Sequence, residues 1–213
     1  FLFAHDCELI IFACNTVSAE ALRKIQQEYL PAQYPGKNVL GVLKPASEVA
    51  VEITKNNRIG VIATEATVRS RAFEVQLKKE KKGVKVFQKA TQLLVPIVEA
   101  LEKHTKATEM ILKQYLKPLL AKKIDTLILG CTHYGFLENM IRKIVGKKIA
   151  IISEEKIIPR KLQNYLKRHP EYDSKLTKGG SITFYSTDLT DKFRILGSKF
   201  FGKKIAVKKA SLI

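Results

Sequence analysis

Two segments of the chain share one order of residues: an apolar run, a cysteine, and then polar residues. They are residues 9–16 and 127–133, and in them Cys14 and Cys131 hold equivalent places. A thiolate is a nucleophile and a proton acceptor, and a position at a helix N-terminus lowers the pKa of a thiol from about 8.5 towards neutrality. We therefore expect both thiols to be reactive, each with a lowered pKa.

A pair of thiols suits one reaction in particular, the inversion of a stereocentre. One thiolate removes a proton from one face of a substrate carbon while the other thiol delivers a proton to the opposite face. This chemistry needs no cofactor and no metal, and we expect neither. The sequence also has none of the motifs CxxC, HExxH and GxSxG, and no Gly-rich phosphate loop, which would indicate zinc, serine-hydrolase or nucleotide sites.

The residues beside the two thiols could hold an amino acid. Asn15 and Thr16 follow Cys14, and Thr132 and His133 follow Cys131. Their side chains can hydrogen-bond a carboxylate or an amino group. The other interpretation is that free cysteines are small buried hydrophobes, which is usual for a lone cysteine. The matching polar context argues against it for this pair.

Cys7 lacks such polar neighbours, and we interpret it as structural. Three cysteines are an odd and sparse number, which argues against a disulfide framework and for a reducing compartment.

Apolar runs alternate with helical periods along the chain. Leu22, Ile25 and Tyr29, for example, recur at helical spacing. Strands that alternate with helices and read as continuous Ile, Leu and Val runs predict parallel sheets in an α/β protein. Ligands of such sheets bind beyond the carboxyl ends of the strands, where both thiols should lie. The predicted strands are residues 9–13, 38–43, 58–63, 84–87, 126–130, 148–152, 181–185 and 205–207. Residues 168–180 are predicted to form an exposed connection.

Charge is the unusual feature of the composition. The chain has 38 basic and 20 acidic residues, a net charge of +18. Such a balance suits nucleic acids, anionic surfaces or acidic small substrates. The lysines are spread over the whole chain, without interleaved aromatic residues or a nucleic-acid motif, so we favour a solvated surface. No apolar run reaches the roughly 18 residues of a membrane span, and we expect no membrane partner.

The two cysteine segments resemble the paired signatures of glutamate racemases, within the aspartate/glutamate racemase superfamily. The segments that carry the resemblance are residues 13–19 and 129–134, with further matches at 1–6, 60–68 and 94–99. The resemblance covers nearly the whole chain. It implies two pseudo-symmetric α/β domains with mainly parallel sheets and the active site in the cleft between them. Residues 1–42, completed by 153–213, would form the first domain, and residues 43–152 the second.

The resemblance also implies roles for individual residues. Cys14 and Cys131 would be the two proton donors and acceptors, with Cys14 the base on the D isomer and Cys131 the base on the L isomer. Glu99 and His133 would support Cys131 as further catalytic residues. The substrate-binding residues would be Asn15, Thr16, Thr64, Thr67, Thr132 and His133.

The implied function is the interconversion of L- and D-glutamate without a cofactor, supplying D-glutamate for peptidoglycan in a bacterial cytoplasm. The small-molecule substrate would be glutamate, nucleic acid is not expected as a partner, and a homodimer is left open. Two other interpretations remain. One is another superfamily member acting on aspartate, hydantoins or maleate, although the Cys-Asn-Thr and Cys-Thr-His-Tyr pair favours glutamate. The other is a basic nucleic-acid-binding α/β protein whose cysteines are incidental.

The sequence departs from the family pattern in several places. Lys44 stands where the family usually has Glu, Ala63 replaces a common Gly, and Gly135 with Phe136 replaces Pro-Leu. The family's first strand, its Asp-Ser-Gly loop and its Tyr-Gly loop should precede Phe1. We therefore expect the 213 residues to be an N-terminally truncated form without racemase activity of its own.

Overall fold

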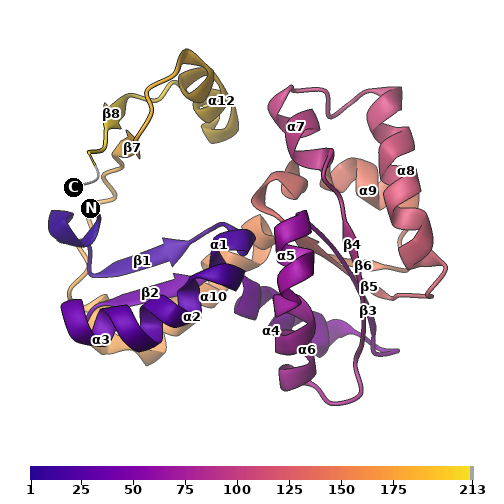
Figure 1. Ribbon diagram of the computed structural model, residues 1–213, viewed down its shortest axis with the longest axis horizontal. Coiled ribbons are helices and arrows are strands. Elements are labelled where there is room, and N and C mark those ends of the chain that lie inside the picture. Colours follow the sequence, from indigo (N-terminus) through magenta and orange to yellow (C-terminus); the bar gives the residue numbers. More distant parts are fainter. Residues whose placement is uncertain (212–213) are drawn as a thin grey trace.

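The computed structural model describes residues 1–211 of the chain. It is a mixed α/β structure with three parallel sheets (Figure 1). Within the described residues, no helix combines the length and the apolar character that a membrane crossing requires.

The largest sheet has four parallel strands in the order β4-β3-β5-β6. The strands are β3 (Arg58–Ala63), β4 (Lys85–Ala90), β5 (Thr126–Gly130) and β6 (Ala150–Ile152). Every residue of β5 is buried. Because successive side chains of a strand point to opposite faces, such a continuous apolar run needs cover on both sides.

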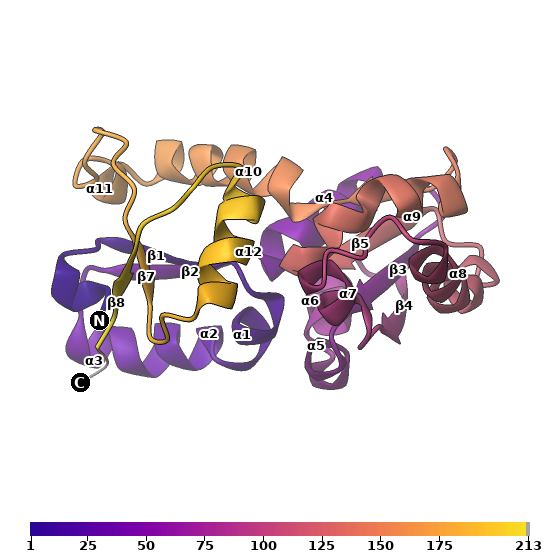
Figure 2. The same cartoon turned by 90° about the horizontal axis from the view of Figure 1, so that it is seen from above.

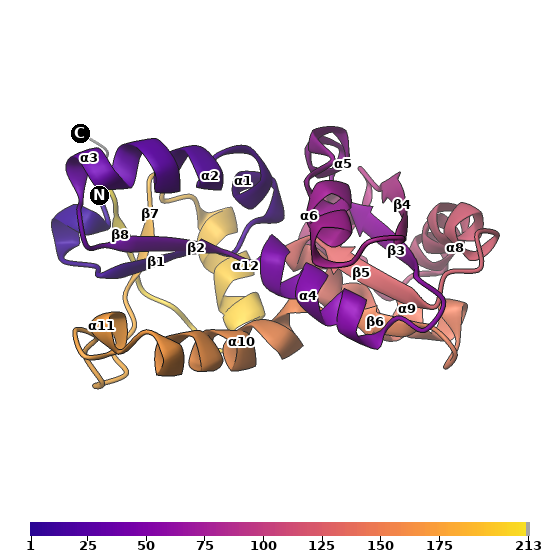
Figure 3. The same ribbon diagram turned by 90° about the horizontal axis from the view of Figure 1, so that it is seen from below.

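Helices supply that cover, as Figures 1 and 3 show. One face packs against α4 (Leu43–Ile53), α5 (Glu65–Ser70) and α6 (Ala72–Glu80), and the other against α7 (Leu94–Glu99), α8 (Lys106–Leu120) and α9 (Glu138–Val145). Ile128 belongs to the core that contains Phe73 of α6. Leu127 and Leu129 belong to the core that contains Leu112 of α8. Alternate residues of one strand therefore anchor two separate helical layers. We call this sheet with its helices the larger lobe.

A smaller lobe contains the two-stranded sheet of β1 (Leu9–Phe12) and β2 (Asn38–Gly41), preceded by η1 (Phe3–His5). The chain between the strands forms α1 (Asn15–Glu20), α2 (Leu22–Lys24), the π-helical turn η2 (Ile25–Tyr29) and α3 (Leu30–Gln33). The long helix α10 (Glu154–Arg168) returns from the larger lobe along the opposite face of this sheet (Figure 2). The amide of Asn38 donates a hydrogen bond of 2.7 Å to the hydroxyl of Tyr165 in α10.

A third sheet pairs β7 (Phe184–Ser186) with β8 (Val207–Lys209), and α12 (Asp191–Phe201) lies between them in the chain. The side chain of Ile205, just before β8, is buried and packs against Gly197 of α12. A Cβ at Gly197 would lie 2.7 Å from the terminal methyl group of Ile205, so the two segments approach closely here.

The predicted α/β fold with parallel sheets is confirmed, and each predicted strand has a counterpart. The bounds differ where backbone pairing decides them. β4 extends to Ala90, beyond the predicted end at residue 87, because it pairs with β3 residue by residue as far as Ala63. The predicted strand 181–185 was wrong at its start, since the ladder with β8 begins only at Phe184. Likewise β8 begins at Val207 and not at residue 205.

The connection predicted at residues 168–180 is largely exposed, but it contains the short helix α11 (Pro170–Asp173). Pro170 is the first residue of this helix, a position where the fixed φ of proline is already helical and its missing N–H costs nothing. The Gly, Pro and Ser content of the segment is typical of a loop, so the sequence did not predict this helix.

Gly130 gives a test of how tightly β5 is packed. A Cβ at this position would lie 2.7 Å from a ring carbon of Phe73 and 3.1 Å from the backbone oxygen of Ile62. We predict that Gly130→Ala lowers the free energy of unfolding by about 1–3 kcal/mol, because a backbone oxygen cannot move aside as a side chain can. Urea denaturation measures this.

Gly179→Ala is the matched control, since no atom lies within 4 Å of the Cβ that it would add. We expect it to change stability by less than about 0.5 kcal/mol. Equal effects of the two substitutions would contradict tight packing at the end of β5.

Candidate active site

Both predicted thiols lie at the carboxyl end of a parallel strand. Cys14 follows β1 as the N-cap residue of α1, and Cys131 follows β5 as the N-cap residue of the 3-10 helix η3 (Thr132–Leu137). Both have extended backbone conformations, which end the strand and begin the helix. Their exposure differs, because Cys14 is exposed whereas Cys131 is buried, with 9% of its surface accessible.

The pKa of the Cys131 thiol depends on burial and on the charges around it. Burial raises the pKa of Cys131 from 9.0 to about 11, and repulsion from Cys14 and Glu154 adds to this, whereas a hydrogen bond from the backbone of His133 lowers the pKa. The prediction of a lowered pKa was wrong for Cys131. Loss of water around the buried sulfur outweighs the backbone dipoles of a short 3-10 helix.

Three further side chains form a connected row beside Cys131. The Sγ atom of Cys131 lies 3.8 Å from Nδ1 of His133, and Nε2 of His133 lies 3.5 Å from a carboxylate oxygen of Glu99. The other oxygen of Glu99 accepts a 3.2 Å hydrogen bond from Lys192 of α12. The His133 ring also meets Phe200 edge-on, with 6.3 Å between the ring centroids. Glu99 and Lys192 therefore hold His133 beside the thiol.

Three threonine hydroxyls, one from the smaller lobe and two from the larger lobe, form a ring in which each lies within hydrogen-bond distance of the other two. The Oγ1 atom of Thr16 in α1 lies 2.9 Å from that of Thr64 and 3.0 Å from that of Thr67, and Thr64 and Thr67 are 2.9 Å apart. Thr64 is also the N-cap of α5, since its hydroxyl accepts from the backbone N–H of Thr67. The predicted substrate-binding residues of both lobes thus meet directly.

Asn15 and Glu154 form the buried polar part of the site. Asn15 is 2% exposed and Glu154, at the start of α10, is 6% exposed. Burial raises the pKa of Glu154 to about 8, an effect that Asn15 reduces and Glu155 increases. Glu154 was not predicted from the sequence. A signal existed, since it follows the apolar strand β6 as the cysteines follow theirs.

Not all predicted residues make such contacts. Thr132 is exposed, and no side-chain hydrogen bond of Thr132 is present among residues 1–211. The sequence did not predict a role for Lys192, because nothing distinguishes it from the many other lysines of the chain. The described part of the chain also holds no group of three His, Cys, Asp or Glu side chains placed to bind a metal ion.

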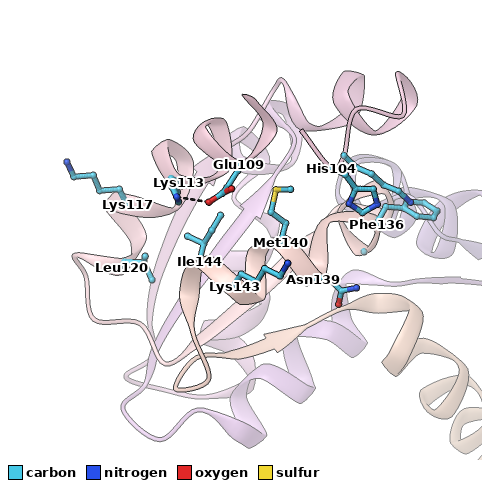
Figure 4. Close-up of a pocket in the computed structure, with 12 residues that line it drawn as sticks. His104, Glu109, Lys113, Lys117, Leu120, Phe136, Asn139, Met140, Lys143 and Ile144 are labelled. Carbon is cyan, nitrogen blue, oxygen red and sulfur yellow. Dashed lines mark ion pairs between the residues drawn. The ribbon is translucent and has the colours of Figure 1, made fainter. Parts of the chain in front are cut away.

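A cavity of about 1110 Å³ lies apart from these residues, against α8 and α9 (Figure 4). None of the predicted site residues lines it. Lys113, Lys117 and Lys143 line it, and of these three, within residues 1–211, only Lys113 forms an ion pair, with Glu109 at 2.6 Å. Part of the positive charge of the chain therefore gathers on an open surface outside the candidate site.

Lys44, the departure from the family pattern, is exposed near the start of α4 and lies 3.8 Å from Glu48. A Cβ at Gly135 would lie 2.5 Å from a carboxylate oxygen of Glu155, at the end of an exposed side chain. Nothing in the structure explains why glycine replaces the usual proline.

Comparison with known proteins gives consistent matches. The family model described as Asp/Glu/Hydantoin racemase matches residues 2–155. The glutamate racemase of Chlorobaculum tepidum is 39% identical over 204 residues, which cover 96% of this chain and 73% of that protein. That of Persephonella marina is 37% identical over 214 residues, covering 100% of this chain and 76% of that protein.

Solved structures agree with the sequence matches. A glutamate racemase isoform from Bacillus anthracis superposes with a TM-score of 0.86 at 30% identity, over 99% of this chain and 77% of that one. The glutamate racemase from Francisella tularensis in complex with D-glutamate gives a TM-score of 0.85 at 30% identity, over 99% and 76%. The chain thus spans about three quarters of the proteins that it matches.

The unequal exposure of the two thiols predicts unequal labelling. At about pH 7.5, iodoacetamide should modify Cys14 well before Cys131, since only the thiolate reacts and Cys131 is buried with a raised pKa. The rate at Cys131 should rise about tenfold per pH unit until its pKa near 11 is reached. Peptide mass spectrometry at timed intervals measures both rates, and the urea-unfolded protein serves as the control. Faster labelling of Cys131 than of Cys14 would contradict the described burial.

Proposed function

Because the chain belongs to the Asp/Glu/Hydantoin racemase family, we propose that the protein expressed from its complete gene interconverts L-glutamate and D-glutamate. Relatives 37–39% identical are named glutamate racemases, and a structural neighbour was solved with D-glutamate. The observation that carries the proposal is the pair of thiols at two strand ends, near enough for one to influence the charge of the other. Family membership also argues against an incidental pair of cysteines in a nucleic-acid-binding protein.

The reaction proceeds by two proton transfers across the α-carbon. The thiolate of one cysteine takes the α-proton and becomes a thiol, while the other thiol gives its proton to the opposite face and becomes a thiolate. The carbon–hydrogen bond on one face breaks as the bond on the other face forms, so the substrate leaves inverted and no redox step occurs. Following the family, Cys14 acts as base on the D isomer and Cys131 on the L isomer.

His133 assists the buried thiol. A rise of the Cys131 pKa from 9.0 to about 11 corresponds to about 3 kcal/mol against the thiolate. A hydrogen-bonded imidazole that accepts the thiol proton offsets part of this cost. Glu99 keeps the ring oriented for that exchange, and Lys192 in turn holds Glu99.

The hydroxyls of Thr16, Thr64 and Thr67 and the amide of Asn15 bind the substrate, together with the more exposed Thr132. Hydroxyls can donate to a carboxylate or accept from an ammonium group. Since Thr16 belongs to the smaller lobe and Thr67 to the larger one, a ligand in contact with both also holds the lobes together.

We extend the proposal to the remaining expectations of the family. Residues 1–42 with 153–213 form one domain and residues 43–152 the other. The product D-glutamate supplies peptidoglycan synthesis in the cytoplasm of a bacterium. The chemistry of the site requires no cofactor.

Serine substitutions test the two-thiol reaction. In the protein expressed from its complete gene, Cys14→Ser and Cys131→Ser should each lower kcat for both isomers by at least about 1000-fold, because a serine hydroxyl is too weak an acid to exchange the proton. Circular dichroism follows the conversion of either isomer.

Cys7→Ser is the matched control and should leave kcat within about twofold, since Cys7 precedes β1, at the end of the strand opposite to Cys14. If either Cys14→Ser or Cys131→Ser turned over both isomers at the wild-type rate, the two-thiol reaction would be wrong.

The row from Cys131 to Lys192 gives a second test. Glu99→Gln removes the charge that orients His133. We expect kcat/KM to fall about tenfold, because this factor corresponds to the free energy of one charge-assisted hydrogen bond. Because enantiomers have equal free energies, the fall must be the same in both directions. Glu102→Gln removes an exposed carboxylate of the same segment and should have no such effect. Equal kinetics of the two variants would exclude a role for Glu99.

A further inference from the structure

Two polar side chains are buried at the site without a hydrogen-bond partner of normal geometry. They are Asn15, through both atoms of its amide, and Glu154, through both carboxyl oxygens, and this holds for the described part of the chain. A buried polar group without a partner destabilises the folded protein, and a charged one destabilises it more. Two such groups side by side therefore need an explanation beyond packing.

The surroundings of Glu154 decide its charge state. A hydrogen bond from Asn15 of α1 lowers its pKa, the charge of Glu155 raises it, and the charge of Glu154 in turn raises the pKa of the Cys131 thiol. These neighbours are acidic or neutral, and no ion pair of Glu154 occurs among residues 1–211. A carboxylate in this place would be desolvated and would lie near other groups that become negative. The carboxyl group is therefore neutral at pH 7, in line with its raised pKa of about 8.

We propose that Glu154 is a positioning residue of the site, whose neutral carboxyl group pairs with the Asn15 side-chain amide and so holds that side chain next to Cys14. This role rests on the function proposed above. A neutral carboxyl group can accept from the amide N–H and donate to the amide carbonyl, whereas a carboxylate can only accept. The neutral acid also keeps a negative charge away from the Cys131 thiol and from an anionic substrate.

Ionisation of Glu154 removes both benefits at once. The carboxylate has no proton to donate to Asn15, and its charge opposes formation of the Cys131 thiolate and repels glutamate. The group is neutral below its pKa of about 8 and charged above it. Turnover should therefore fall as the pH rises through about 8, and the fall should reach about tenfold one pH unit higher.

Glu154→Gln separates this role from simple packing. Glutamine has the same shape, can donate to the Asn15 carbonyl and cannot ionise. We expect kcat/KM of this variant to stay within about threefold of wild type at about pH 7 and to lack the fall at about pH 9. Glu155→Gln is the matched control, since it removes the neighbouring carboxylate, which is exposed and hydrogen-bonded to Ser153. It should keep the fall in turnover, moved to somewhat lower pH, because the charge of Glu155 adds to the raised pKa of Glu154.

A second readout does not depend on turnover. Iodoacetamide labelling of Cys131 at about pH 9 should be several-fold faster in Glu154→Gln than in wild type and unchanged in Glu155→Gln, because only the first removes the charge beside the thiol. In the wild-type protein, carbon-13 NMR of labelled glutamate side chains should show one carboxyl group titrating near pH 8, even if the variant fails to fold.

The outcomes separate the two proposals. A labelling difference at Cys131 with no glutamate turnover in wild type would overturn the proposed function and leave the neutral acid in place. Identical pH profiles and labelling rates in Glu154→Gln and wild type would overturn the role of Glu154, as would the absence of a high-titrating carboxyl group.

Discussion

The site depends on a constraint of sheet geometry: parallel strands that pair in register end at the same edge. In the larger lobe Ala63 pairs with Gly130, so the next residues, Thr64 and Cys131, leave the sheet as neighbours. The register is fixed because β5 is buried on both faces, and a slip by one residue would exchange its two helical layers. A hydroxyl group and a thiol are therefore brought together by the core and not by loops.

Burial gives the two sides of the site different chemical characters. Cys14 is exposed, whereas Cys131 and Glu154 have both lost water and both have raised pKa values, to about 11 and about 8. Desolvation is the first cause in each case, and the charge of Glu154 adds to the raised pKa of Cys131. At neutral pH the buried side is therefore uncharged until a proton moves, so an anionic ligand meets no fixed negative charge there.

Much of the arrangement could be predicted from the sequence, because it is local. The apolar runs predicted the strands. The polar residues that follow two of these runs predicted that Cys14, Cys131 and the residues beside them belong to the site. Contacts between distant segments left no local signal. The pairing of Lys192 with Glu99 and the approach of Asn15 to Glu154 join residues more than 90 positions apart. The direction of the Cys131 pKa could not be predicted either, since it depends on how much water the fold removes.

The ring of Thr16, Thr64 and Thr67 has a consequence for handedness. Each hydroxyl can donate one hydrogen bond and accept another. The three hydrogen bonds can therefore all run in one direction around the ring or all in the other. Enantiomers present their carboxylate and ammonium groups to a fixed surface in mirror-related orders. Donor-only or acceptor-only side chains would match one order and oppose the other. In the proposed reaction, amphiprotic groups that reverse their polarity by rotation about a single C–O bond let one surface bind both mirror images of the same molecule.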